Sequence, residues 1–196
     1  MRAKSPRGCA IKTFKERCEM NSTSKLMAAA GLAVSLSSAA AQDTFWIAGS
    51  GNWNNAAKWS AGVPNSPTAN AIIADPGGYI ITLNLSVSLA NLQKVIPGPQ
   101  LNMLPGTFID LYGGVFSNDG ATVVNTSASN NGTAIRFHSV NHIIAADPGE
   151  FGELTLNAYG PNLDSAYLQS FDGITVTNDE DHTINGCGNI YARMNN

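Results

Sequence analysis

Short runs of apolar and β-branched residues recur along the chain from Ala71 onward, separated by Gly, Asn, Asp and Pro. Apolar and polar residues alternate inside several of these runs, which is the pattern of a half-buried β-strand. The sequence therefore predicts an all-β chain of short strands joined by turns. The predicted strands lie in the runs AIIA, YIITLNLSV, FIDLY, ATVVN, AIRFHSV, HIIAA, ELTLN, GITVT and HTINGCGNI.

Residues 85–96, LSVSLANLQKVI, are the one segment that also fits a helix. Leu85, Val87 and Leu89 alternate with polar residues at period two, which favours a strand. We expect a strand first, and a helical turn after it stays open.

An internal echo suggests that the strands repeat. Residues 72–77 and 81–84 (IIADPG and ITLN) are matched by residues 143–149 and 154–157 (IIAADPG and LTLN), and the two Asp-Pro-Gly turns lie 72 residues apart. Three turns of about 24 residues fit this interval and the length range of stacked repeats. Chance similarity is the alternative, because Asp, Pro and Gly are common turn residues.

These features favour a right-handed parallel β-helix (solenoid) over an antiparallel β-sandwich, which is the alternative. The Asp-Gly and Asn-Gly pairs are not spaced as hairpin centres, and several runs are shorter than sandwich strands. Gly and Asn accept the backbone angles that the corners of a β-helix need. Residues 71–196 are expected to form roughly five coils, incomplete at the C-terminal end.

Three tryptophans, Trp46, Trp53 and Trp59, precede the first regular strand, within residues 42–70. An open end of a β-helix exposes strand edges that must be covered. We therefore expect this segment to form an aromatic N-terminal cap. The same indoles are candidates for carbohydrate contact, because their faces also suit sugar rings, and a separate N-terminal core is a third possibility. Burial decides among these alternatives, since tryptophan is highly buried on average.

The first 41 residues have the pattern of a secretory signal peptide. Seven of the 11 cations precede an uncharged apolar stretch, LMAAAGLAVSLSSAAA, at residues 26–41, which ends in an A-x-A site at Ala39 and Ala41. The stretch is shorter than the roughly 20 residues that span a bilayer. We expect cleavage near Ala41, which places the mature chain outside the cell or at its surface. Met20 opens a more ordinary leader and is a possible true start.

The mature chain expected from this cleavage is acidic, with four cations against 12 acids, a net charge of −8. Nucleic-acid binding needs clustered Lys and Arg, so nucleic acid is excluded as a partner. Only Cys187 of the three cysteines remains after cleavage, which leaves no internal disulfide. No membrane span is expected in the mature chain.

Two segments resemble a known class of exported bacterial proteins. The front segment GNWNNAAKWSAGVPNSPTANAII and the late pattern T-I-x-G-x-G-x-I resemble the autotransporter-associated β-strand repeat and PEP-CTERM-type exported proteins. The matching residues are Gly51, Asn52, Trp53, Trp59, Gly62, Pro64, Asn65, Thr183, Ile184, Gly186, Gly188 and Ile190. The resemblance covers about residues 44–95 and 171–191, and it implies a passenger-like parallel β-helix. The chain lacks the C-terminal barrel or sorting tail of those families, which fits a fragment or a released protein.

Candidate chemistry is sparse. Asp179, Glu180 and Asp181 form the one acidic cluster, just before His182. Three adjacent acids on a strand point to alternate faces, so two of them could share a cation at most, and Asp179 and Asp181 are weak metal candidates. His138 and His142, if they share a strand, lie about 13 Å apart, too far for one metal. No catalytic residue and no cofactor is predicted.

The sequence thus predicts a non-catalytic, secreted or cell-surface β-helix with a structural or adhesin-like role. Glycans, cell-surface components and extracellular matrix components are its possible partners. The alternative is a carbohydrate-binding module, or the remnant of a polysaccharide-degrading β-helix that uses Asp179, Asp181 and His182. Exposed tryptophans beside a cleft would favour this alternative, whereas buried indoles would favour the structural role.

Overall fold

The computed structural model describes residues 12–13, 41–127, 132–159, 165–171 and 173–195. Its secondary structure in these ranges consists of β-strands and one 3₁₀ turn, η1 (Ala56–Lys58). The all-β fold expected from the sequence is therefore confirmed. In the described part of the chain no helix is both long and apolar enough to cross a membrane. The predicted signal peptide lies outside the described residues except for Lys12, Thr13 and Ala41.

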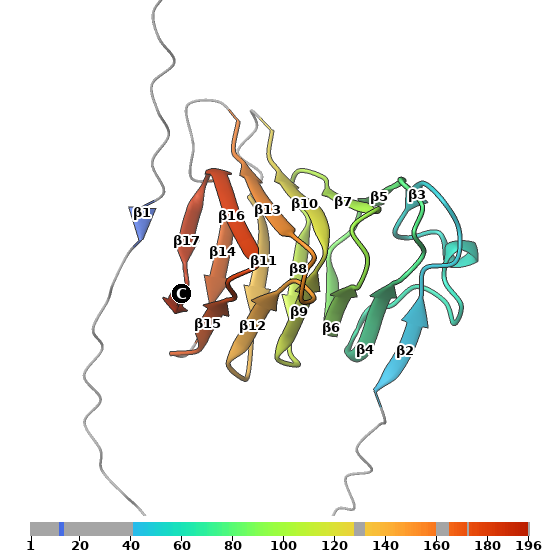
Figure 1. The fold of residues 1–196 in the computed structure, drawn as a ribbon, viewed down its shortest axis with the longest axis horizontal. Coiled ribbons are helices and arrows are strands. Elements are labelled where there is room, and N and C mark those ends of the chain that lie inside the picture. The colour runs from blue at the N-terminus through green and yellow to red at the C-terminus, as the bar shows by residue number, and fades with distance from the viewer. Residues whose placement is uncertain (1–11, 14–40, 128–131, 160–164, 172, 196) are drawn as a thin grey trace, which may run out of the picture.

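The strands are short and succeed one another along almost the whole described part of the chain (Figure 1). Their bounds are β1 (Lys12–Thr13), β2 (Gln42–Phe45), β3 (Gly51–Asn52), β4 (Ser66–Ile73), β5 (Ile80–Leu83), β6 (Val87–Lys94), β7 (Gln100–Met103), β8 (Phe108–Leu111), β9 (Val115–Asn118), β10 (Gly120–Asn125), β11 (Thr133–Phe137), β12 (His142–Ala145), β13 (Gly152–Asn157), β14 (Ala166–Ser170), β15 (Thr175–Asn178), β16 (His182–Cys187), β17 (Asn189–Tyr191) and β18 (Arg193–Asn195).

The strands form three stacks, and every ladder between these strands is parallel. The first side contains the start of β6, then β8, β11, β14, β17 and β1. The second side contains β2, β4, the end of β6, β9, β12, β15 and β18. The third side contains β3, β5, β7, β10, β13 and β16. An antiparallel β-sandwich is therefore wrong for this chain.

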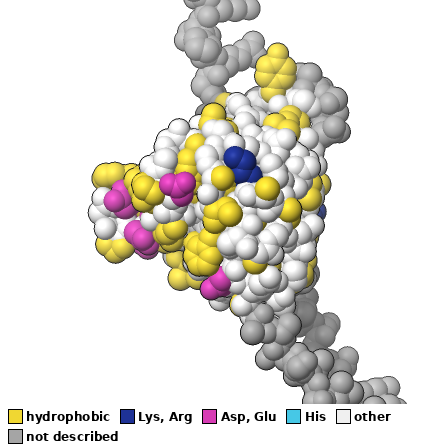
Figure 2. Space-filling view, turned by 90° about the vertical axis from the view of Figure 1, so that its right-hand side faces the viewer, with side chains coloured by type: hydrophobic (Ala, Val, Ile, Leu, Met, Phe, Trp, Pro, Cys, Tyr) yellow, Lys and Arg dark blue, Asp and Glu magenta, His cyan; other side chains and the backbone are white. Residues whose placement is uncertain are grey.

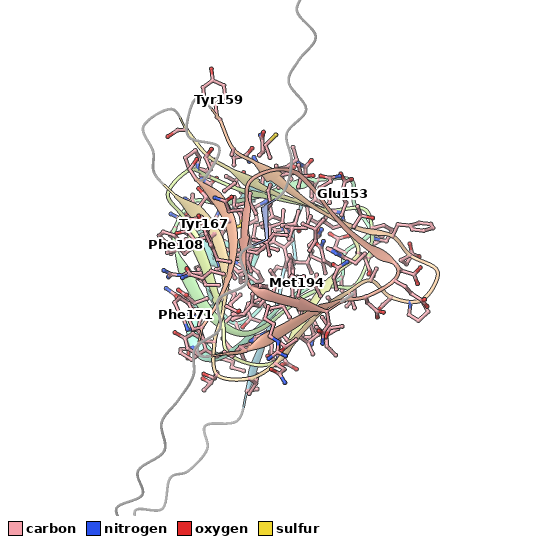
Figure 3. All side chains as sticks on the ribbon, turned by 90° about the vertical axis from the view of Figure 1, so that its left-hand side faces the viewer. Phe108, Glu153, Tyr159, Tyr167, Phe171 and Met194 are labelled. Carbon is pink, nitrogen blue, oxygen red and sulfur yellow. The ribbon has the colours of Figure 1, made fainter. Side chains whose placement is uncertain are left out.

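The three sides enclose one hydrophobic core, and the ribbon has a triangular outline when viewed from the end that carries β17 and β18 (Figure 3). Alternate side chains of each strand point inward, so equivalent positions of successive passes stack on one another. On the third side, for example, the inward row is Leu83, Met103, Val124 and Leu156, all fully buried.

The internal echo of the sequence corresponds to three steps along the third side. Ile81 pairs with Leu101, Leu101 with Thr122, and Thr122 with Leu154. The two echo strands, β5 and β13, are thus three passes apart, as expected from three turns of about 24 residues. The individual steps are unequal, at 20, 21 and 32 residues, because the later passes contain longer corner segments.

Residues 87–94 form one continuous strand, β6, and the helical turn that remained open in the sequence is wrong. The first three residues of β6 pair with β8 and the last three with β9, so this strand runs along two sides. Leu89 and Leu92 are both fully buried on either side of this bend. The change of direction thus explains why the period-two pattern breaks in the middle of the segment.

The outer surface carries rows of hydrogen-bonded polar side chains, most of which are asparagines. Asn70 donates from Nδ2 to Asp43 Oδ1 at 2.7 Å, and Asn91 donates to Asn70 Oδ1 at 2.9 Å. A second row runs along the third side, and its members are Asn102, Asn125 and Asn157. Figure 2 shows the end of the molecule that carries η1, where charged side chains are scattered among uncharged atoms.

Candidate functional site

The three tryptophans are buried at the leading end of the stacks. Trp46, Trp53 and Trp59 are 2%, 0% and 3% exposed and belong to the same hydrophobic cluster as the first strands. Trp59 meets both other rings edge to face, at centroid distances of 5.0 and 4.7 Å. Each indole N–H donates to a backbone carbonyl, those of Gly49, Pro64 and Trp53 respectively.

Burial of the indoles decides between the interpretations of this segment. A sugar platform needs an indole face open to solvent, and none of the three tryptophans offers one. Carbohydrate contact by Trp46, Trp53 and Trp59 is therefore corrected to a packing role. The segment is also continuous with the stacks rather than a separate core, because β2 pairs with β4 and β3 pairs with β5.

The acidic cluster and His182 do not form a common site. Asp179 and Glu180 are exposed in the turn that follows β15, whereas His182 is 4% exposed beneath the surface. Among the described residues no group of three His, Cys, Asp or Glu side chains is gathered closely enough to hold a metal ion. A shared catalytic or metal role for Asp179, Asp181 and His182 therefore has no geometric support.

The two remaining histidines lie on opposite sides of a corner and do not share a strand. β11 ends at Phe137 and β12 begins at His142, and the turn between them includes Ser139 with a φ of 72°. His142 is fully buried, and its Nε2 donates to the carbonyl of His138 at 3.1 Å. Burial lowers the pKa of His142.

His138 belongs to a polar and aromatic cluster on the outside of the first side. Asp110 accepts two hydrogen bonds from Arg136, one from Nε at 2.7 Å and one from Nη2 at 2.5 Å, and it also binds His138 Nε2 at 2.7 Å. The imidazole is stacked between Tyr112 and Phe171, each at a centroid distance of 4.6 Å. Because neighbouring rings cover both faces of His138, this cluster holds successive passes together.

A shallow hollow lies on the third side, near the corner that it shares with the second side. Its volume is about 510 Å³. Ala121, Glu153 and Thr183 form one outward row across β10, β13 and β16, and Figure 3 shows Glu153 on the outside of this side. Phe151 stands at the rim with 78% of its surface exposed. The lining residues are Gly120, Ala121, Phe151, Gly152, Glu153, Thr183 and Asn185.

The polar groups of the hollow are joined by the carboxylate of Glu153. Its Oε1 accepts from Asn185 Nδ2 at 2.6 Å and from the hydroxyl of Thr155 at 3.2 Å. Oε2 of Glu153 makes no hydrogen bond with any described residue. The carboxylate of this exposed residue is therefore held in place through one oxygen.

A buried polar network lies beneath the hollow. Lys94 is fully buried, and its Nζ donates to Ala121 O at 2.7 Å, to Asn118 Oδ1 at 3.2 Å and to Thr122 Oγ1 at 3.5 Å. Asn118 in turn donates to the carbonyl of Glu153 at 3.1 Å. The carbonyls of two lining residues are thus anchored from below, so the floor of the hollow has buried support.

The donor and acceptor of each hydrogen bond in this network can be assigned without conflict. Asn118 Oδ1 accepts from Lys94 and Thr122, so its Nδ2 is a donor and His182 Nε2 must accept at 2.9 Å. The proton of the imidazole then sits on Nδ1, which donates to Asn178 Oδ1 at 2.8 Å. Only a neutral His182 satisfies this arrangement, because an imidazolium would set two donors against each other.

Burial dominates the titration of the network. It lowers the pKa of Lys94 to about 7, against a smaller opposite effect of Asp119. It also lowers the pKa of His182 to about 4, with a further contribution from the charge of Lys94. Burial raises the pKa of Asp119, whose Oδ1 accepts from the backbone N–H of Asp147 while Oδ2 is buried without a partner among the described residues.

Cys187, at the end of β16, is disulfide-bonded in the full chain. The other two cysteines of the sequence, Cys9 and Cys18, lie outside the described residues. The expected lack of a disulfide applies to residues 42–196 alone, and it stays a prediction for that shorter chain.

The residues of the hollow and its supporting network carry no sequence signal as a group. Phe151 and Glu153 stand near an Asp-Pro-Gly turn, and Lys94 looks isolated in the chain. In comparisons with known proteins, no family model, no curated protein and no solved structure matches this chain.

Proposed function

We propose that the chain is an exported, non-catalytic parallel β-helix with a structural or adhesin-like role outside the cell. In this proposal the three sides are the faces of a right-handed β-helix, because crossovers between parallel strands are right-handed in nearly all proteins. The buried indoles of Trp46, Trp53 and Trp59 plug its leading end. The parallel ladders and the single core support this description.

The rows of outward amides are the observation that carries the proposed role. Asn70 is joined to Asp43 and Asn91, and Asn125 to Asn102 and Asn157, so each row is hydrogen-bonded from pass to pass. Such rows make an ordered polar surface, in which Asp43 is the one charged member. A surface of this kind suits many weak contacts with neutral extracellular material, and it offers no cationic cluster for nucleic acid.

Export is the second part of the proposal, and it rests on the leader pattern of residues 1–41. Lys12 and Thr13 belong to that leader, and in the full chain they pair with Asn189 and Ile190 of β17. Cleavage after Ala41 would remove β1 and expose this edge of β17. An open edge is a place where another strand can pair.

Expression of the full chain with a C-terminal tag in a Gram-negative host tests the proposal. We expect the tagged protein outside the cytoplasm, starting at Gln42 by mass spectrometry, and increased attachment of the cells to glycan-coated surfaces. Substitution of the cleavage site, Ala41→Leu, should retain the leader. An intact chain in the cytoplasm, or an exported chain without any effect on attachment, would contradict the proposal.

A carbohydrate-binding module is the second candidate function, and the hollow around Phe151 and Glu153 favours it. This candidate differs from the tryptophan platform considered from the sequence, because the indoles are buried. The remnant of a polysaccharide-degrading enzyme has less support, since His182 is buried and hydrogen-bonded while Asp179 faces solvent.

A further inference from the structure

We propose that the hollow on the third side binds one neutral sugar residue of a glycan or polysaccharide chain. In this site Phe151 provides the apolar face, and Glu153, Thr183 and Asn185 provide the hydrogen bonds. The inference deepens the proposed adhesive role by naming a ligand class and the residues that contact it. It does not depend on export, because it concerns the folded protein alone.

The chemistry of the lining residues selects a ligand rich in hydrogen-bond donors. Glu153 offers Oε2, Asn185 offers its amide oxygen, and Thr183 offers a hydroxyl that can donate or accept. None of these three groups forms a hydrogen bond with a described residue. Sugar hydroxyls donate to such acceptors, whereas a uronic acid or a phosphate would meet the negative charge of Glu153 with like charge.

The apolar part of the site is a single exposed ring. Phe151 is the most exposed of the large hydrophobic side chains in the described residues, at 78%, and it stands beside the polar groups rather than alone. The C–H face of a pyranose is apolar and packs on an aromatic ring, while its hydroxyls reach the neighbouring carboxylate and amide. One ring does not make the aromatic cage that a quaternary ammonium group needs.

The shape of the hollow fits part of a longer chain. Its volume of about 510 Å³ is within the range of ligand sites, and it is open to solvent. Ala121, in the outward row, has a small side chain, so a ligand can approach the floor closely at this position. Lys94 and Asn118 hold the carbonyls of Ala121 and Glu153 from beneath, which keeps the lining in position before a ligand arrives.

The first side is a weaker candidate, although it has more aromatic residues. The ring faces of Tyr112 and Phe171 are turned toward His138, and the guanidinium of Arg136 lies over Phe108 at 4.2 Å from the ring centroid. These faces are therefore used within the protein. Phe151 is different because no aromatic ring or guanidinium of the described residues is stacked on it.

Affinity electrophoresis of the purified full chain tests the inference. The native gels contain xylan, galactomannan or β-glucan as neutral probes, and polygalacturonate as the acidic probe. We expect retardation on at least one neutral polysaccharide and none on polygalacturonate. Phe151→Ala should weaken the retardation at least tenfold, and Glu153→Ala should have a similar effect. Both side chains are exposed, so circular dichroism and the thermal midpoint should stay unchanged.

Tyr159→Ala is the matched control, because Tyr159 is an exposed aromatic residue at 65% that does not line the hollow (Figure 3). It should bind like the wild type. The inference is overturned if no neutral polysaccharide retards the protein, if Phe151→Ala binds as well as Tyr159→Ala, or if polygalacturonate binds best. Preferential binding of tetramethylammonium, measured by competition or by NMR shifts of residues 151–153, would also overturn it.

A negative result in this test does not contradict the proposed export and adhesion, because those are tested by the localisation of the protein and by cell attachment. Conversely, a cytoplasmic protein that still binds a neutral polysaccharide through Phe151 would contradict the export proposal while supporting the site. The two hypotheses are thus separated by their measurements.

Discussion

Asn118 and His182 are separated by 64 residues in the chain, and Asn118 Nδ2 donates a hydrogen bond to His182 Nε2 across 2.9 Å. This contact joins the end of β9 to the start of β16 within the interior. It requires a neutral imidazole, because a protonated Nε2 would oppose the amide donor. The relationship therefore makes the fold sensitive to acid.

Stability should fall as the pH decreases from about 6.5 to about 4. The folded pKa of His182 is lowered to about 4 by burial, whereas an unfolded histidine titrates near 6.5. Within this window the unfolded chain binds a proton that the folded chain does not, which favours unfolding by up to about 3 kcal/mol. Urea unfolding at pH 7, 5.5 and 4.5 measures the loss.

The variant His182→Asn isolates this contribution. It should lose less stability than the wild type between pH 7 and pH 4.5, even if it is less stable at pH 7. Equal slopes for the two proteins would show that His182 does not titrate as the hydrogen bonds require.

Lys94 should produce a second pH dependence, in the alkaline range. Burial lowers its folded pKa to about 7, and the unfolded value is near 10.4. Between these values the unfolded chain holds the extra proton, so stability should rise with pH, by roughly 3 kcal/mol from pH 7.5 to 9.5. Lys94→Met removes the titrating group, and its unfolding free energy should change much less over the same interval. A rise of similar size in Lys94→Met would refute the assignment.

Trp53→Ala should destabilise the chain by about 3–5 kcal/mol, as expected for deletion of a fully buried indole. Trp53 is 0% exposed and packs against Trp59 at 4.7 Å between ring centroids. The control Ile47→Ala removes a side chain that is 56% exposed in the same region and should change stability little. Urea unfolding followed by circular dichroism compares the two variants. Tryptophan emission of the wild type should also resist quenching by acrylamide. Strong quenching would mean that the indoles are exposed.

Gly120→Ala should be more costly than Gly62→Ala, although both glycines have positive φ angles, +76° and +86°. A Cβ on Gly120 would lie 2.3 Å from the carbonyl oxygen of Pro97, whereas a Cβ on Gly62 would meet nothing within 4 Å. Gly62→Ala therefore reports the backbone strain alone, about 1 kcal/mol. We expect Gly120→Ala to exceed it by at least about 2 kcal/mol, a typical cost of overpacking. Equal thermal midpoints for the two variants would contradict the close spacing of successive passes.

The sequence predicted the class of the fold because short alternating runs and turn residues are local signals. It also predicted the leading tryptophans correctly as a buried group, since clustered indoles need cover. Other strands have too few apolar residues to be recognised from the sequence. β7 reads Gln-Leu-Asn-Met, and only Leu101 and Met103 face the core. Two inward side chains are enough for a strand that is paired on both edges, but they do not make a pattern.

The candidate site was beyond the sequence for a different reason. The contacts of Lys94 with Asn118 and of Asn118 with His182 depend on which residues of successive passes face each other. That register cannot be predicted from a single repeat length, because paired residues of neighbouring strands on the third side are 20 to 32 residues apart in the sequence. Corner segments of different length absorb the difference without disturbing the ladders. The proximity of residues such as Phe151 and Asn185 therefore cannot be predicted before the fold is known.

The central claim is that successive passes of the chain stack in parallel along one axis. Distances between spin labels, measured by double electron–electron resonance, test it most directly. Spin labels attached to p-acetylphenylalanine at position 52 and at position 155 or 185 lie four and five steps apart on the third side. The strand spacing of about 4.8 Å predicts separations of about 19 Å and about 24 Å between the labelled backbone sites. A difference of about 5 Å between the two label pairs, after allowance for the linkers, supports the stack. Two equal distances, or a shorter distance for position 185, would contradict it.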